Sequence, residues 1–228
     1  MFQIDALLQL EETIPFCRRC PRLVAWREQV ALEKRRAFHD QEYWGKPVPG
    51  FGDPQARVLI IGLAPGAHGS NRTGRMFTGD ASGNFLYSAL HRSGFASQPQ
   101  ARQRNDGLAL KDVFITAVCR CAPPGNKPSR EEIAACLPFL QQEMDLLPNL
   151  KGIVALGSIA FREYLTLSGK KQSNLLFGHG AYYSWDDGQP WLLAAYHPSR
   201  QNTQTGRLTV DMFDHIWQTV RSKLEQVD

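Results

Sequence analysis

Residues 57–66 read RVLIIGLAPG, an apolar run that ends in glycine and proline. A short run of this kind is typical of a strand that is buried on both faces. Three more runs have the same character and are separated from one another by helical patterns: DVFITAVCR (112–120), KGIVALGS (151–158) and WLLAAYHPS (191–199). This alternation predicts an α/β fold, namely a single three-layer α/β/α domain with a four-stranded parallel sheet.

The segments around these strands carry helical signals. Ser129 and Glu132 have the spacing of a capping box and begin the helical stretch SREEIAACLPFLQQEMDLL (129–147). Further helices are predicted in MFQIDALLQLEET (1–13), SGNFLYSALHRSGF (82–95), AFREYLTLSG (160–169) and LTVDMFDHIWQTVRSKLEQ (208–226). Residues 171–189 are less regular and fit an antiparallel excursion or a loop. Residues 1–56 are expected to form an N-terminal layer of the one domain, 1–228.

Composition narrows the class of protein. The chain has 228 residues, of which 43% are hydrophobic, enough for a sizeable core. No apolar run is long enough to span a bilayer, and the N-terminus lacks the basic region and cleavage site of a signal peptide. We therefore expect a cytoplasmic protein without a membrane partner, in which disulfides are disfavoured. The formal net charge of +4 is compatible with nucleic acid but does not require it.

Polar residues gather after the predicted strands. The stretches are GLAPGAHGSNRTGRMFTGD (62–80), CRCAPPGNKP (119–128), LGS (156–158) and YHPSRQNTQTG (196–206). In a parallel sheet, ligands bind beyond the carboxyl ends of the strands. The sequence thus predicts one site built from these loops.

The five cysteines need a separate explanation. Cys17 and Cys20, within FCRRCPRL (16–23), have the spacing of a metal-binding knuckle, and Cys121 and Cys136 are candidates to complete a four-thiolate site. Thiolates select zinc or an iron–sulfur centre. The fourteen residues between Cys121 and Cys136 slightly favour a cluster over a zinc ribbon. Cys119 fits a small buried hydrophobe but stays an alternative ligand.

The order of the motifs is specific. GLAPGA (62–67), GSNRTGR (69–75) and FTGD (77–80) come first, CAPPGNKP (121–128) follows, and HPSRQNT (197–203) is last. Together with the cysteines, these motifs resemble the iron–sulfur uracil-DNA glycosylases, and most of all family 5, or type b. The resemblance runs from about Cys17 to the last helix. It implies the uracil-DNA glycosylase fold and a structural 4Fe–4S cluster on Cys17, Cys20, Cys121 and Cys136, with zinc as the alternative.

The resemblance also implies an activity. A uracil-DNA glycosylase hydrolyses the N-glycosidic bond of uracil in DNA and leaves an abasic site. Leu63, Ala64 and Ala117 stand where other members of the superfamily often carry polar residues, which implies a broader range of bases: hypoxanthine, ethenocytosine and 5-hydroxymethyluracil. No catalytic lysine stands out, so a monofunctional enzyme is expected, with Lys127 as the one lysine that could complicate this. By analogy, the protein is expected to act as a monomer.

Each expected catalytic residue has a structural alternative. His197 is expected to donate a hydrogen bond to the uracil O2, or else to be a satisfied structural histidine. Asp80 orients water or stabilises positive charge on the sugar, or else caps a helix. Asn126 contacts the base edge or a water, or else serves a turn. Phe77 stacks on the base or belongs to the core. The remaining residues expected to contact the base are Gly62, Ala64, Gly66 and Ala67.

The polar loop after His197 is expected to contact DNA. Residues expected to hold phosphates or to fill the gap left by an extruded base are Arg72, Arg75, Ser199, Arg200 and Gln201. Two other classes of function stay open. One is a protein that binds damaged or single-stranded DNA without cutting it, against which the joint presence of Asp80, Asn126 and His197 argues. The other is a hydrolase directed at RNA or free nucleotides.

Overall fold

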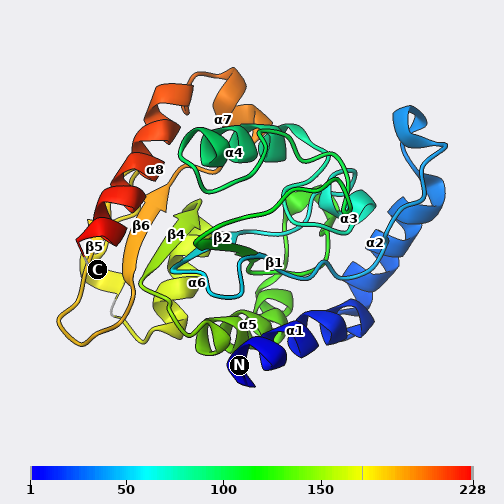
Figure 1. The fold of residues 1–228 in the computed structure, drawn as a ribbon. Helices are drawn as coiled ribbons and strands as arrows, with labels where there is room; N and C mark the ends of the chain where they lie inside the picture. Colours follow the sequence, from blue (N-terminus) through cyan, green and yellow to red (C-terminus); the bar gives the residue numbers. More distant parts are fainter. Residues whose placement is uncertain (1, 171, 227–228) are drawn as a thin grey trace.

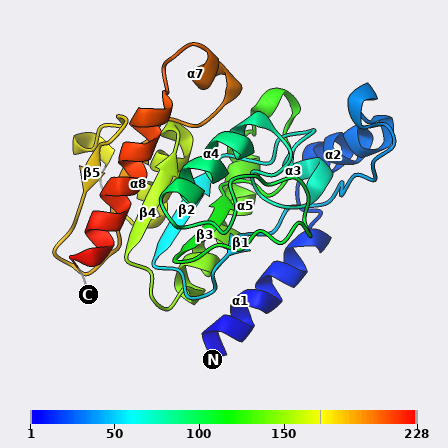
Figure 2. The ribbon, with the colours of Figure 1, turned by 45° about the horizontal axis from the view of Figure 1, so that its top comes forward.

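The computed structural model describes residues 2–170 and 172–226, and its centre is one sheet of six strands (Figures 1 and 2). Four strands in the middle are parallel, in the spatial order β3 (Val113–Ala117), β2 (Val58–Gly62), β4 (Gly152–Leu156) and β6 (Trp191–Ala195). Every residue of these strands is buried, which explains their uninterrupted apolar runs. The predicted parallel sheet is confirmed.

Two short edge strands make the sheet larger than predicted. β1 (Phe51–Gly52) pairs antiparallel with β3, and β5 (Tyr182–Tyr183) pairs antiparallel with β6. The predicted count of four strands was therefore wrong by two. Each edge strand is only two residues long, so neither shows the alternation that marks a strand in a sequence. β5 lies in the irregular segment 171–189, where an antiparallel excursion was one of the two alternatives.

Helices cover both faces of the sheet, as Figure 1 shows. One face carries α4 (Ala81–Arg92), α7 (Arg200–Gln204) and α8 (Val210–Glu225). The other carries α1 (Phe2–Thr13), α5 (Arg130–Leu146) and α6 (Ser158–Leu167). The predicted capping box opens α5, because Ser129 accepts from the backbone of Glu132 and the Glu132 carboxylate accepts from the backbone of Ser129. Among the described residues, no helix has the length and hydropathy needed to cross a membrane.

The N-terminal segment runs along the loop edge of the sheet. It contains α2 (Pro21–Glu33), which lies near the short helix α3 (Ser70–Thr73) of the first loop (Figure 2). Backbone hydrogen bonds join the segment after α2 to two loops. Trp44 and Gly45 donate to Arg72 and Asn71 of the first loop, and Val48 donates to Arg120, which follows β3. The remaining short turns are Ile14–Phe16, Arg36–Phe38, Pro124–Asn126 and Gln172–Asn174.

Charged groups are buried where α1 and α5 pack beneath the sheet. Arg120 and Glu143 form a fully buried ion pair, and Thr116 donates a hydrogen bond of 2.6 Å to Glu143 Oε2. Glu11 of α1 faces the same pair. Burial, reinforced by the negative charge of Glu143, raises the pKa of Glu11 to about 9. At neutral pH Glu11 therefore keeps its proton, and α1 docks without adding a second negative charge.

This proton makes the stability of the protein depend on pH. Between pH 4.5 and about 9 the folded state holds a proton on Glu11 that the unfolded chain releases. The free energy of unfolding then falls as pH rises, by at most about 1.4 kcal/mol per pH unit. Glu11→Gln, which keeps a donor but cannot titrate, is expected to increase the free energy of unfolding at pH 8 and to change it little at pH 4.5. Urea unfolding at both pH values measures this, with the exposed Glu12→Gln as control. An equal effect at both pH values contradicts the assignment.

Candidate active site

Loops at the carboxyl ends of the parallel strands surround a cavity of about 800 Å³. Three of the four predicted loops contribute side chains to it, and Gly157 of the fourth packs behind the Cβ of His197. The predicted residues that line the cavity are Ala64, Gly66, Ala67, Phe77, Asp80, Asn126, His197, Ser199, Arg200 and Gln201. The structure therefore brings these residues together around one cavity at the predicted edge of the sheet, and their roles there stay predictions.

Phe77 forms one wall of the cavity. Its backbone lies in the left-handed region with a φ of 51°, and its ring is 5.7 Å from the ring of His197, centroid to centroid. A Cβ at Gly62 would lie 2.9 Å from the Phe77 ring, so the absence of a side chain at Gly62 makes room for that ring. Gly62 therefore lies behind the Phe77 ring and is not among the residues that line the cavity, and its predicted contact with the base stays a prediction.

Asp80 uses its two carboxylate oxygens differently. Oδ1 accepts from the backbone N–H of Gly83 at 2.9 Å and caps α4. Oδ2 faces the first loop, where a Cβ built on Gly69 would lie 2.0 Å from it. Burial raises the pKa of Asp80, while the N–H groups of the cap and the charge of Arg72 oppose this shift. The structure thus supports the helix cap through Oδ1, while Oδ2 accepts no hydrogen bond from the Gly83 N–H.

His197 follows β6 and is neutral at pH 7, because burial lowers its pKa to about 4. The turn that holds it is fixed by two side chains: Asn202 donates 2.8 Å to the carbonyl oxygen of His197, and Ser199 caps α7 by accepting from the backbone of Asn202. A neutral imidazole carries a single N–H and donates it without bringing a charge into the cavity.

A second histidine, His68, lines the same cavity and is held by a residue that the sequence patterns did not indicate. The hydroxyl of Tyr43 accepts from the backbone N–H of Arg35 at 3.3 Å and lies 3.1 Å from His68 Nδ1. The hydroxyl can donate to Nδ1 or accept from it, and the tautomer of His68 decides which. Burial and the charges of Arg35 and Arg72 lower the pKa of His68. Tyr43 lies in an irregular segment without a motif.

Two of the predicted phosphate ligands point into the protein. Arg72 is buried against the Phe38 ring and donates 2.8 Å bonds to the carbonyl oxygens of His68 and Gly79. Arg75 is buried and forms two 2.8 Å bonds with the Asp106 carboxylate. Both guanidinium groups brace the first loop, and Arg72 also lines a second cavity beside the main one. That they hold phosphates stays a prediction.

Exposed basic side chains instead stand at the rim. Arg200 lines both the main cavity and an adjoining cavity of about 810 Å³, and Asp80 lies at their boundary. Arg35 lines the main cavity and Arg102 the adjoining one. Ser199 serves chiefly as the cap of α7, while Gln201 is exposed next to Arg200. The two cavities share part of their lining, and exposed arginines stand at their edges.

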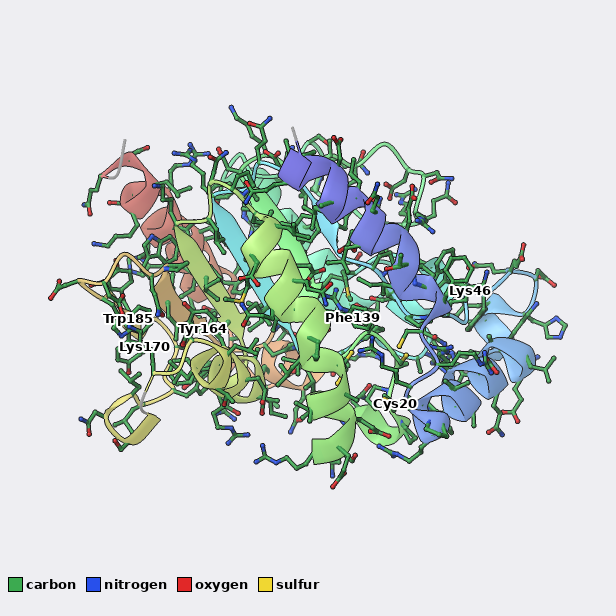
Figure 3. The ribbon with its side chains drawn as sticks, turned by 90° about the horizontal axis from the view of Figure 1, so that it is seen from below. Cys20, Lys46, Phe139, Tyr164, Lys170 and Trp185 are labelled. Carbon is green, nitrogen blue, oxygen red and sulfur yellow. The ribbon has the colours of Figure 1, made fainter. Side chains whose placement is uncertain are left out.

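The predicted thiolate ligands come together on the other side of the first loop. Cys17 and Cys20 flank the start of α2, Cys121 follows β3, and Cys136 lies in α5, which Figure 3 shows beside Cys20. Arg27 Nη1 donates to Cys121 Sγ at 2.9 Å, and the backbone N–H of Arg120 donates to Cys136 Sγ at 3.2 Å. Cys119 is fully buried in the core under the sheet, and its thiol is hydrogen-bonded to that of Cys136, so both alternatives for Cys119 stay open.

The surroundings of these thiols fit a negatively charged, thiolate-bound centre. Across residues 2–170 and 172–226, no group of three or more His, Cys, Asp or Glu side chains is arranged to hold a metal ion. The thiols nevertheless receive hydrogen bonds from two N–H donors, and the Nε of the buried Arg27 has no partner. A buried cation needs an anion nearby, which a thiolate-bound iron–sulfur cluster supplies.

Comparisons with known proteins agree on one family. The family model described as the uracil DNA glycosylase superfamily matches residues 49–221. A Type-5 uracil-DNA glycosylase of Thermus thermophilus is 56% identical over 202 residues, which is 89% of this chain and 91% of that protein. One from Mycobacterium tuberculosis is 50% identical over 95% of this chain and 81% of its own. A Type-4 uracil-DNA glycosylase of Pyrobaculum aerophilum is 35% identical over 85% of this chain and 83% of its own.

The inward position of Arg75 has a consequence for stability. Arg75→Met keeps most of the side-chain volume but leaves Asp106 buried without its cation. We expect the free energy of unfolding to fall by about 3 kcal/mol, the scale for breaking a buried ion pair from one side. Arg102→Met, at an exposed arginine of the same region, is the control in urea unfolding. A loss no larger than in this control would contradict the bracing role.

Proposed function

The chain belongs to the uracil DNA glycosylase superfamily and is a monofunctional uracil-DNA glycosylase of DNA repair, and we propose that it acts through the cavity between Phe77, Asp80 and His197. The observation that carries this proposal is the arrangement of that cavity: an aromatic wall, a neutral N–H donor and a carboxylate oxygen around one space. A base inside a duplex is hidden from such a site, so the nucleotide must be extruded into it.

His197 has the chemistry required to stabilise the leaving base. In hydrolysis the bond from C1′ to the base nitrogen breaks, the base takes the electron pair, and water forms the new bond to C1′. Negative charge then grows on the uracil O2. The hydrogen bond that the neutral imidazole of His197 donates to O2 becomes stronger as this charge grows. One such donor contributes about 3 kcal/mol to a transition state. Stacking on Phe77 would hold the ring in place.

Asp80 is the one acidic residue among the described residues that line the main cavity. Its Oδ2 is free of the helix cap and faces the first loop, where Leu63 and Ala64 offer no carboxylate. A carboxylate here accepts a proton from the attacking water or stabilises positive charge on the sugar. Asn126 lies exposed at the rim with a φ of 57°, so it serves the turn and can also reach a base edge. The described lining includes no lysine, which agrees with hydrolysis without a covalent enzyme intermediate.

The lining supports a range of bases. Leu63, Ala64 and Ala117 present apolar surface to the cavity and impose few hydrogen bonds on a base edge. Its volume of about 800 Å³ leaves space for a purine. We therefore include hypoxanthine, ethenocytosine and 5-hydroxymethyluracil among the proposed substrates, after uracil.

DNA is proposed to follow the exposed basic rim. Arg35, Arg102 and Arg200 stand along the two adjoining cavities, where they can meet phosphates, which position the strand. Gln201, exposed beside them, is the proposed side chain for the gap left by the extruded base.

A 4Fe–4S cluster is proposed on Cys17, Cys20, Cys121 and Cys136. When bound, it supplies a structural crosslink and takes no part in bond cleavage. The crosslink would join the start of α2 to α5 and to the loop that carries Asn126, five residues after Cys121. Zinc is the alternative ligand of the same thiols.

Base release separates catalysis from binding. Asp80→Asn keeps an oxygen for the cap and removes only the charge, and we expect it to slow single-turnover uracil release by about 10²-fold or more. His197→Ala is expected to slow it by about 10²–10³-fold. The exposed His91→Ala is the control. Wild-type protein that binds uracil-containing DNA but releases no uracil would favour the non-catalytic alternative, and full rates in both variants would overturn the assigned chemistry.

Metal content distinguishes the cluster from zinc. We expect about four iron and four sulfide ions per chain, with the visible absorption of an iron–sulfur centre. Cys20→Ala is expected to lose both ions and colour, while Cys119→Ala keeps them, because Cys119 lies outside the proposed ligand set. About one zinc per chain, or loss of the cluster in Cys119→Ala alone, contradicts this ligand set.

A further inference from the structure

Arg27 of α2 lies in the middle of the proposed ligand set. The residue is 1% exposed, and its Nη1 is 2.9 Å from Cys121 Sγ. The same guanidinium donates from both Nη atoms to the carbonyl oxygen of Cys17, at 3.3 Å each. A single side chain therefore holds residues from two of the chain segments that supply thiolates.

No buried carboxylate in the described residues neutralises Arg27. The acid nearest to it in the ion pairs of the structure is Glu28, at 3.7 Å, and that side chain is 44% exposed and engaged with Arg18. The other fully buried arginine of this region, Arg120, is matched by Glu143. Arginine does not give up its proton in proteins, so the charge of Arg27 persists in the interior. An anion beside it offsets the cost of burial.

The position of Arg27 is fixed from its backbone as well. The side chain of Asn71, fully buried, donates to the carbonyl oxygen of Arg27 at 3.3 Å and to that of Ala67 at 3.4 Å. The backbone N–H of Asn71 donates to Gly66 at 3.0 Å. Gly66 and Ala67 line the main cavity, so the first loop of the active site holds Arg27 in place.

We propose that Arg27 is the counter-ion and anchor of the iron–sulfur cluster: its guanidinium donates to the ligand sulfur of Cys121 and balances the negative charge of the thiolate-bound cluster. This inference rests on the proposed cofactor. Donors to a ligand atom orient the ligand and stabilise it, and hydrogen bonds to sulfur together with nearby positive charge favour the more reduced state of a cluster. Arg27 is thus a positioning residue, remote from the base.

The test compares four purified proteins: wild type, Arg27→Met, Arg27→Lys and, as control, Arg18→Met at an exposed arginine near Cys17. After iron and sulfide have been measured, an iron chelator is added without oxygen and the decay of cluster absorption is followed. We expect Arg27→Met to lose its cluster about 10- to 100-fold faster than wild type. Lysine keeps the charge but not the forked donors, so Arg27→Lys should lie between the two. Arg18→Met should match wild type.

A second readout separates the proposed role from a general loss of packing. The reduction potential of the cluster is measured in the fraction of each protein that still holds it. It should be more negative in Arg27→Met and partly restored in Arg27→Lys, a pattern that a packing defect does not produce. Equal decay rates and equal potentials in all four proteins would overturn the role of Arg27 while the cofactor stands. Wild-type protein without iron and sulfide would instead overturn the cofactor and, with it, this inference.

Discussion

Four parallel strands buried on both faces can offer chemistry only at their ends. Thr116 is the one hydroxyl-bearing or charged side chain in these strands, and its hydroxyl donates a hydrogen bond to Glu143. The carboxyl ends therefore carry Phe77, Asp80, Asn126 and His197, on loops that begin after Gly62, Ala117 and Ala195. Because the strands are parallel, these loops leave the sheet at the same edge and their side chains meet there. The position of the active site follows from the burial of the sheet.

A loop rich in glycine would be mobile without bracing, and here arginine provides it. Arg72 and Arg75 are buried, and their N–H groups bind carbonyl oxygens and a carboxylate from the first loop and its neighbours. The cost of burying the two charges is offset by these bonds, which hold Phe77 in its left-handed conformation and Asp80 at the start of α4. Polar groups that are fixed before the substrate arrives need no reorganisation during the reaction, which is where an enzyme gains most from electrostatics.

Periodicity and motif order predict the strands, the capped helix at Ser129 and most of the cavity, because each of these depends on local patterns that the core enforces. Two-residue edge strands leave no such pattern. The sequence pattern also does not show which way an arginine side chain points. Arg72 and Arg35 are both basic residues near loops, yet Arg72 is buried under Phe38 and Arg35 stands at the rim of the cavity. Tyr43 is close to His68 only through the fold. For Asp80 the sequence predicts either a helix cap or a catalytic carboxylate. The two roles are compatible in the structure, because Oδ1 makes the cap and Oδ2 faces the first loop.

The N-terminal layer docks through buried apolar side chains and also through buried charge, and the charged contacts make its attachment conditional. Glu11 of α1 fits beside Glu143 and Arg120 because burial keeps a proton on its carboxyl group. Arg27 of α2 fits beside Cys121 only if something negative balances it, and the proposed cluster does so. Apolar packing alone would hold these helices in place at any pH, whether or not the protein contains a metal centre. The charged contacts tie α1 to a bound proton and α2 to the proposed cluster. Since Asn71 joins Arg27 to the first loop, that proposal extends the same condition to the loop that lines the active site.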